Sequence, residues 1–218
     1  MEPSPERLDL SALREEYSLG GLAESDLESD PLDMFDRWLR QAMAAGVHEP
    51  NAMVVTTVAP DGSPSSRSVL LKKVTDRGLC FYTNQESRKG RELAGDPRCA
   101  LLFPWYELQR QVRIEGRASR LPHADAEAYF ATRPRESQLG AWASAQSRVV
   151  ASREELQQAY DDAAARFAGE AVPCPPYWGG FVVVPDTFEF WQGRRGRMHD
   201  RLVYRRAGDG WRVERLAP

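Results

Sequence analysis

Stretches rich in β-branched and aromatic residues recur along the chain and are separated by turn-forming residues. This pattern is typical of strands joined by tight turns. Pro60-Asp61-Gly62 and Gly208-Asp209-Gly210 each separate two such stretches and predict antiparallel hairpins. Strands are predicted over residues 52–58, 66–74, 79–83, 99–103, 109–118, 180–184, 187–192, 199–206 and 211–216.

The stretch at residues 109–118 shows regular alternation. Val112 and Ile114 would face one side of the strand, whereas Gln111 and Arg113 would face the other. A half-buried strand with one polar face is therefore expected there.

Helical signals are confined to a few segments. Apolar residues recur at helical spacing within residues 32–43, directly after Asp30 and Pro31, which suit an N-cap and a first helical position. Ser87 and Ser152 are also favourable N-caps. Helices are predicted over residues 31–45, 88–93, 123–132 and 152–168.

The predicted strands outnumber the helices and show no regular alternation with them. We therefore expect an α+β fold that is mainly antiparallel, a β-barrel with peripheral helices, rather than a doubly wound sheet. Residues 1–30 are polar and lack sustained periodicity, so an N-terminal arm is expected to precede a domain of residues 31–218.

Composition narrows the class of protein. The chain has 218 residues, of which 42% are hydrophobic and 28% charged, as in a globular domain, and its net charge of −3 argues against a nucleic-acid-binding module. No apolar run approaches the roughly 20 residues that span a membrane, and the N-terminus lacks a secretory signal pattern. A cytoplasmic location is therefore expected. The cysteines are widely spaced without a CxxC pair, which predicts buried free thiols.

Several common motifs are absent from the sequence. It contains no GxGxxG after a strand, no GxxxxGK[ST], no HExxH and no GxSxG. A metal site would need His48, His123 and His199 to converge from distant parts of the chain, so no metal is predicted.

Four clusters of basic residues remain as candidate ligand-binding sites. Residues 67–73 carry basic side chains at both ends of an apolar centre, and taken alone this segment is better explained as a solvated strand edge. Residues 82–89 place cations and hydroxyls at an expected helix start, where free N–H groups favour phosphate, although an ordinary N-cap is an equal alternative. Residues 129–137 combine a tyrosine, arginines and a serine that suit a second phosphate.

The fourth cluster, residues 191–201, is the most unusual. If it is extended, like charges crowd one face, which favours a bound anion or electron-rich ring over a disordered basic loop. Two phosphomonoesters together carry a charge of about −3 to −4, and four cations of the other clusters would balance that charge. The residues on that extended face would be Arg195, Arg197, His199 and Arg201, and the four matching cations are Arg67, Lys72, Lys89 and Arg133.

Taken together, these segments resemble the pyridoxine (pyridoxamine) 5'-phosphate oxidase family. The resemblance runs from Arg14 to the C-terminus and rests on RSVLLKK, FYTNQESRKG, LLFPW, RPRESQLGAWAS, PPYWGGF and FWQGRRGRMHDR. It implies an FMN-binding split β-barrel that forms a homodimer with flavin at the subunit interface. The implied reaction, part of vitamin B6 biosynthesis and salvage, oxidises pyridoxine or pyridoxamine 5'-phosphate to pyridoxal 5'-phosphate with O2 and yields H2O2.

The same resemblance assigns roles to individual residues. Arg197 and His199 would be catalytic beside the substrate ring, and Arg14 and Tyr17 would belong to an arm that closes as a lid. The substrate would be bound by Arg14, Tyr17, Lys72, Tyr129, Arg133, Ser137, Arg197 and His199. FMN would be bound by Arg67, Lys72, Tyr82, Thr83, Arg88, Lys89, Gln111, Gln146, Ser147, Trp191 and Arg201, with Arg67, Arg88, Lys89 and Ser147 at its phosphate.

One pair conflicts with simple strand geometry. Strict alternation puts Arg67 and Lys72 on opposite faces of one strand, although both are assigned to the same ligand neighbourhood. A bulge, a backbone contact or contributions from two subunits would reconcile them, and we favour two subunits. A non-catalytic flavin-binding split-barrel protein is the alternative function, but it leaves the second phosphate site unexplained.

Overall fold

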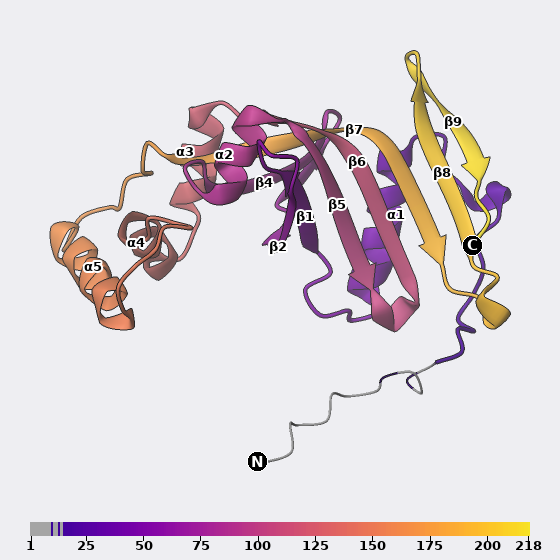
Figure 1. Ribbon diagram of the computed structural model, residues 1–218, viewed down its shortest axis with the longest axis horizontal. Helices are drawn as coiled ribbons and strands as arrows, with labels where there is room; N and C mark the ends of the chain where they lie inside the picture. The colour runs from indigo at the N-terminus through magenta and orange to yellow at the C-terminus, as the bar shows by residue number, and fades with distance from the viewer. Residues whose placement is uncertain (1–9, 11–12, 14) are drawn as a thin grey trace, which may run out of the picture.

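The computed structural model describes residues 10, 13 and 15–218, which fold around one antiparallel sheet of nine strands (Figure 1). The strands are β1 (Ala52–Val58), β2 (Pro64–Leu70), β3 (Lys73–Thr75), β4 (Gly78–Asn84), β5 (Arg98–Trp105), β6 (Arg110–Arg120), β7 (Trp178–Gln192), β8 (Asp200–Ala207) and β9 (Gly210–Arg215). Their order is β2-β1-β5-β6-β7-β4-β3, with β8 paired to β7 and β9 to β8. The predicted mainly antiparallel α+β fold is confirmed.

The long strand β7 joins two parts of the sheet. Residues 178–183 pair with β4 and residues 187–192 with β8, while β6 runs along the other edge. The sequence predicts two strands here, but the structure has one continuous strand. The β6–β7 register shifts beside Pro185, and such a bulge tolerates a residue without an N–H donor, so the strand continues past the proline. Gly116 allows the close approach, since a Cβ on it would lie 2.2 Å from the carbonyl oxygen of Val184.

The helices are α1 (Pro31–Ala44), α2 (Arg88–Gly95), α3 (His123–Ala131), α4 (Arg135–Ala143) and α5 (Arg153–Arg166), with 3-10 turns at Glu24–Asp26, Tyr106–Leu108 and Arg195–Arg197. The predicted N-caps Asp30, Ser87 and Ser152 all accept a backbone hydrogen bond from the first turn. Helix α4 was not expected, because Pro134 ends α3 but also stands at the N-cap of α4.

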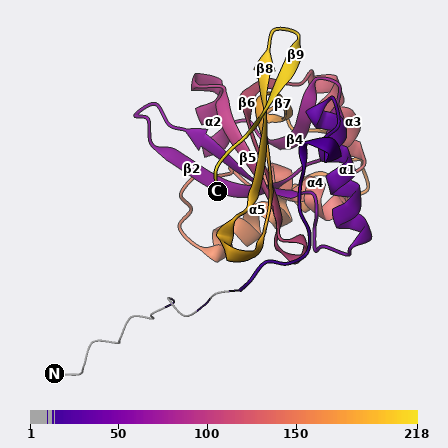
Figure 2. The ribbon, with the colours of Figure 1, turned by 90° about the vertical axis from the view of Figure 1, so that its right-hand side faces the viewer.

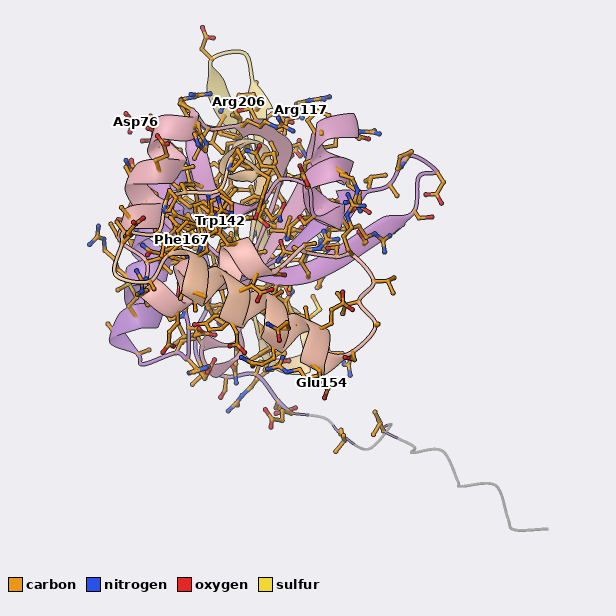
Figure 3. All side chains as sticks on the ribbon, turned by 90° about the vertical axis from the view of Figure 1, so that its left-hand side faces the viewer. Asp76, Arg117, Trp142, Glu154, Phe167 and Arg206 are labelled. Atoms are coloured by element: carbon orange, nitrogen blue, oxygen red, sulfur yellow. The ribbon has the colours of Figure 1, made fainter. Side chains whose placement is uncertain are left out.

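Two apolar cores arrange these elements. Helix α1 packs against the sheet (Figure 2), with the ring centroids of Phe35 and Phe103 4.8 Å apart. A second core joins α3, α4, α5 and the start of β7; within it, Trp142 lies beside Phe167 (Figure 3). Helices α4 and α5 therefore form one end of the molecule, and the β8–β9 hairpin forms the other (Figure 1).

The described part of the N-terminal segment lies against the C-terminal strands. Leu22 is buried, and its N–H donates to Oδ2 of Asp200 at 3.0 Å. The N–H of Ser18 donates to Oε1 of Gln109 at 2.8 Å. Residues 17–24 therefore contact the domain, and whether the segment opens and closes as a lid stays a prediction.

The remaining sequence expectations concern thiols and membranes. All three cysteines are free; Cys80 and Cys99 are buried as predicted, whereas Cys174 is only half-buried. None of the helices in the described ranges is both long and apolar enough to cross a membrane.

Candidate functional site

A cavity of about 1040 Å³ lies between β2, β4, α2 and the α3–α4 region. Three of the four basic clusters converge on it, although they are far apart in sequence. The predicted site residues that line it are Arg67, Lys72, Tyr82, Thr83, Arg88, Lys89, Tyr129, Arg133, Ser137, Gln146 and Ser147. Ser147 has a left-handed backbone with φ of 71°, a conformation that is often retained at functional sites.

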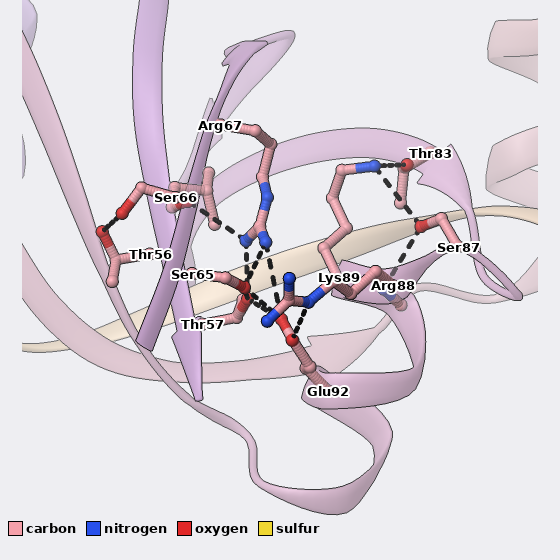
Figure 4. A network of polar contacts seen from close by, with 12 residues as sticks. Thr56, Thr57, Ser65, Ser66, Arg67, Thr83, Ser87, Arg88, Lys89 and Glu92 are labelled. Carbon is pink, nitrogen blue, oxygen red and sulfur yellow. Dashed lines mark hydrogen bonds and ion pairs between the residues drawn. The ribbon is translucent and has the colours of Figure 1, made fainter. Parts of the chain in front are cut away.

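Lys89 is the most deeply buried cation of this cavity, with 7% of its surface exposed. Its ammonium donates to the neutral hydroxyls of Thr83 at 2.7 Å and Ser87 at 3.3 Å (Figure 4). It also donates to the amide oxygen of Gln146 at 3.2 Å. Burial, followed by repulsion from Arg67, lowers the pKa of Lys89 to about 8. No carboxylate forms an ion pair with it in the described part of the chain.

Two arginines stand beside Lys89 at the cavity wall. Arg67 comes from β2 and Arg88 from the first turn of α2, and both contact the carboxylate of Glu92 (Figure 4). Arg67 also donates at 2.5 Å to the hydroxyls of Thr57 and Ser65. Burial lowers the pKa of Arg67, but a guanidinium remains protonated in proteins.

Arg133 and an aromatic stack form another part of the wall. The guanidinium of Arg133 lies 4.9 Å from the ring centroid of Trp178, and its buried Nη1 has no hydrogen-bond partner among the described residues. Tyr82 stacks on Tyr129 with ring centroids 4.3 Å apart and on Trp178 at 5.6 Å. The rings fix the position of the arginine while leaving part of its hydrogen-bonding capacity unused.

The structure resolves the conflict between Arg67 and Lys72 within one chain. Strand β2 ends at Leu70 and β3 begins at Lys73, so Lys72 lies outside both strands and does not follow their alternation. Both side chains line the same cavity. The prediction of one strand over residues 66–74 was therefore wrong, and a second subunit is not needed to bring this pair together.

The other described residues of the predicted site form a second group outside the cavity lining. Trp191 and His199 have ring centroids 4.6 Å apart, and Tyr17 lies 5.8 Å from Trp191 and 5.7 Å from His199. Arg201 donates to Glu189 at 2.9 Å. The second group comprises Tyr17, Gln111, Trp191, Arg197, His199 and Arg201, of which Gln111, Trp191 and Arg201 are cross-strand neighbours.

The predicted extended face over residues 195–201 is not formed. Arg195–Arg197 is a 3-10 turn in which Gly196 and Arg197 have φ of 62° and 60°. Two consecutive left-handed residues turn the chain, so period-2 alternation does not apply there. Nδ1 of His199 accepts a hydrogen bond from the N–H of Arg194 at 3.1 Å, and burial and the charge of Arg197 lower the pKa of His199.

Some residues fall outside these two groups. Arg14 lies outside the described residues. Sequence reasoning missed Trp178 and Glu92, although Glu92 stands four residues after Arg88 on a predicted helix, a spacing that signals an ion pair. Within the residues that the structure describes, no three His, Cys, Asp or Glu side chains gather where they could hold a metal ion.

Comparisons with known proteins agree on one family. Residues 39–167 match the pyridoxamine 5'-phosphate oxidase family, and residues 178–218 match the pyridoxine 5'-phosphate oxidase C-terminal dimerisation region. A pyridoxine/pyridoxamine 5'-phosphate oxidase from Nocardioides sp. is 60% identical over 97% of this chain and 99% of its own. Its counterpart from Rubrobacter xylanophilus is 55% identical over 99% and 100%.

Solved structures support the same fold. PhzG from Burkholderia lata 383, in complex with tetrahydrophenazine-1-carboxylic acid, is 34% identical over 89% of this chain and 95% of its own, with a TM-score of 0.85. A pyridoxamine 5'-phosphate oxidase-related, FMN binding protein from Nostoc punctiforme is 16% identical over 88% and 100%, with a TM-score of 0.71, which indicates a shared split-barrel fold. The chain belongs to the pyridoxine/pyridoxamine 5'-phosphate oxidase family, and it is an oxidase of that family.

Proposed function

We propose that the cavity binds FMN and a phosphorylated pyridine together and that the enzyme oxidises pyridoxine or pyridoxamine 5'-phosphate to pyridoxal 5'-phosphate, with O2 as acceptor and H2O2 as product. With the pyridoxamine substrate, water replaces the amine, which leaves as ammonia. The observation that carries this proposal is a pair of cations in one cavity whose charge no carboxylate of the described chain balances. Lys89 is buried against neutral oxygens, and Nη1 of Arg133 is buried with no hydrogen-bond partner among the residues that the structure describes. Two such groups suit two phosphate monoesters.

The residues around Lys89 fit the phosphate of FMN. Ser87 caps α2, so the free N–H groups of the first helical turn lie beside the cations of Lys89 and Arg88. Helix N-termini favour anions through these groups and through the helix dipole. The cavity volume of about 1040 Å³ also suits two medium-sized ligands.

The residues around Arg133 fit the phosphate of the substrate. Ser137 adds a hydroxyl from the first turns of α4, and Lys72 adds a second cation to the same cavity. The rings of Phe130 and Trp178 hold the guanidinium of Arg133, which reduces the entropy lost when it binds an anion.

When bound, FMN supplies the hydride acceptor. The chain itself therefore needs only to bind and orient the two ligands and to exclude water from them. In a neutral His199 whose Nδ1 accepts from Arg194, the proton resides on Nε2. His199 would then donate a hydrogen bond from Nε2 to the substrate rather than remove a proton. Arg197 would bring a positive charge close to the pyridine ring.

We further propose that the site is completed by a second subunit of a homodimer. Trp178 lines the cavity at the start of β7, whereas Trp191 of the second group lies thirteen residues further along the same strand. At about 3.3 Å per residue, roughly 40 Å of strand separates them, which exceeds the reach of one bound flavin. The match of residues 178–218 to a dimerisation region supports a partner as the source of the second group.

Anaerobic addition of pyridoxine 5'-phosphate tests the catalytic part of this proposal. The purified protein is expected to be yellow, to lose its flavin absorption band on mixing without air, and to regain it when O2 is admitted. Titration with inorganic phosphate is the control and should leave the band unchanged. A yellow protein whose band persists with both pyridoxine 5'-phosphate and pyridoxamine 5'-phosphate would instead be a non-catalytic flavin carrier.

Raising the pH should weaken FMN binding through Lys89. The phosphate is already fully charged above about pH 7, whereas Lys89 with a pKa of about 8 loses its proton as the pH rises further. The dissociation constant for FMN is therefore expected to be flat near pH 7 and to rise up to about tenfold per unit above pH 8. Fluorescence titration measures this, and Lys89→Arg should give a flat profile. A flat profile in the unmodified chain would contradict the assignment.

A further inference from the structure

Glu92 is an unexpected residue behind a cationic cavity. Only 5% of its side chain is exposed, and it lies on α2, one turn after Arg88. Four donors surround it and no other carboxylate contacts it among the described residues. The carboxylate accepts from the Thr57 hydroxyl, from Ser65 Oγ at 2.7 Å, from Arg88 Nε at 2.7 Å and from Arg67 Nη2 at 3.5 Å (Figure 4).

These donors keep the carboxylate ionised. Burial alone would raise the pKa of Glu92, but the hydrogen bonds from Thr57, Ser65 and Arg88 outweigh burial and lower it to about 2. Glu92 therefore carries a full negative charge across the pH range in which the protein would work.

The carboxylate divides its two oxygens between two arginines from separate elements. Oε1 binds Arg88 of α2, and Oε2 binds Arg67 of β2. The side chain of Arg88 is 55% exposed, so few other contacts would hold it at the cavity wall if Glu92 were removed. Long exposed side chains lose considerable rotamer entropy when they are fixed by a ligand, and a preformed contact removes part of that loss.

The charge of Glu92 also matches the cavity to its ligand. Arg67, Arg88 and Lys89 together bring three positive charges, and Glu92 reduces this to a net two. A phosphate monoester carries about −1.5 to −2 charges at neutral pH. The four side chains would therefore be close to neutral with the phosphate bound.

We infer that Glu92 is a positioning residue of the flavin site: it holds Arg67 and Arg88 with their remaining donors directed at the phosphate of FMN. This inference rests on the proposed FMN function, and nothing in it requires Glu92 to touch the flavin. A purely structural role, in which Glu92 only ties α2 to β1 and β2, would predict that replacing Glu92 changes the binding of phosphorylated and unphosphorylated ligands equally.

Comparing FMN with riboflavin separates these two roles, because riboflavin is the same ring system without the phosphate. The dissociation constants of both are measured by fluorescence titration on the full-length, flavin-free chain. Glu92→Gln should weaken FMN binding at least about tenfold and leave riboflavin binding within about twofold. Asp96→Asn is the matched control, since it removes a carboxylate from the C-cap of the same helix whose partner, Arg98, does not line the cavity.

Glu92→Asp guards against a variant that does not fold. It keeps the charge but shortens the reach by one methylene, so it should fold and weaken FMN binding selectively, by less than Glu92→Gln does. Equal losses for FMN and riboflavin, or unchanged FMN binding in either folded variant, would overturn the positioning role. Equal affinity for the two flavins in the unmodified chain would instead overturn the proposed phosphate site itself.

Discussion

Replacing Lys89 with methionine is expected to weaken FMN binding by about a hundredfold, equivalent to about 2.7 kcal/mol. Methionine fills nearly the same volume but removes the ammonium, which is the one buried cation in the cavity that has neutral oxygens as its hydrogen-bond partners in the described chain. A buried charge attracts a phosphate more strongly than an exposed one, because solvent screens it less. Fluorescence titration with FMN measures the change.

Lys73→Met is the matched control for this substitution. Lys73 is exposed at the start of β3 and does not line the cavity, so its loss should change FMN affinity less than about threefold. The melting temperature of the flavin-free Lys89→Met chain should change little, since the substitution removes an uncompensated buried charge together with its hydrogen bonds. A folded Lys89→Met variant that still binds FMN within threefold would show that the phosphate lies elsewhere.

Most strands could be predicted from local patterns, and the errors have identifiable causes. Tight turns such as Pro60-Asp61-Gly62 are local signals, and the hairpin of β1 and β2 forms as expected. The continuity of β7 depends on β6, whose Gly116 lets the neighbouring backbone approach at the bulge. Pro185 in the sequence of β7 could not show that the neighbouring strand β6 would accommodate it at a bulge.

Helix α4 illustrates the same limit. The sequence predicts a helix over residues 123–132 that ends before Pro134, yet this proline also suits the start of the next helix. The amphipathic pattern of α4 is weak because one side of this short helix packs on α5 and another faces the cavity. Tertiary packing therefore determines the helical structure of a segment whose local sequence propensity is ambiguous.

Phosphate binding at the candidate site could be predicted from residue types, whereas the separation of the site residues into two groups could not. Cations beside hydroxyls indicated phosphate, and the structure brings three such clusters into one cavity. The separation of Trp191 and His199 from that cavity depends on how a fifteen-residue strand spans the sheet, which no local pattern encodes. The role of Glu92 was hidden because a carboxylate argues against an anion site until its arginine partners are seen.

If two subunits share each active site, two inactive variants should restore each other's activity. Arg133→Leu damages the cavity group, and Arg197→Met damages the second group near His199. Each variant alone is expected to lose about a hundredfold or more in kcat/KM for pyridoxine 5'-phosphate, because each removes a charged contact that is expected to lie close to the substrate. Both are expected to retain FMN, since the cavity cations at its phosphate remain.

Co-expression of the two variants with different affinity tags allows the mixed dimer to be isolated. One of its two sites would combine an intact cavity with an intact second group, and the other would carry both defects, so about half of the unmodified activity should return. The control pairs Arg133→Leu with Lys72→Met, which both line the cavity, so every site keeps one defect and stays inactive. If the first mixed dimer is as inactive as the control, the second group does not serve the partner's cavity, and the proposed arrangement of the active site is wrong.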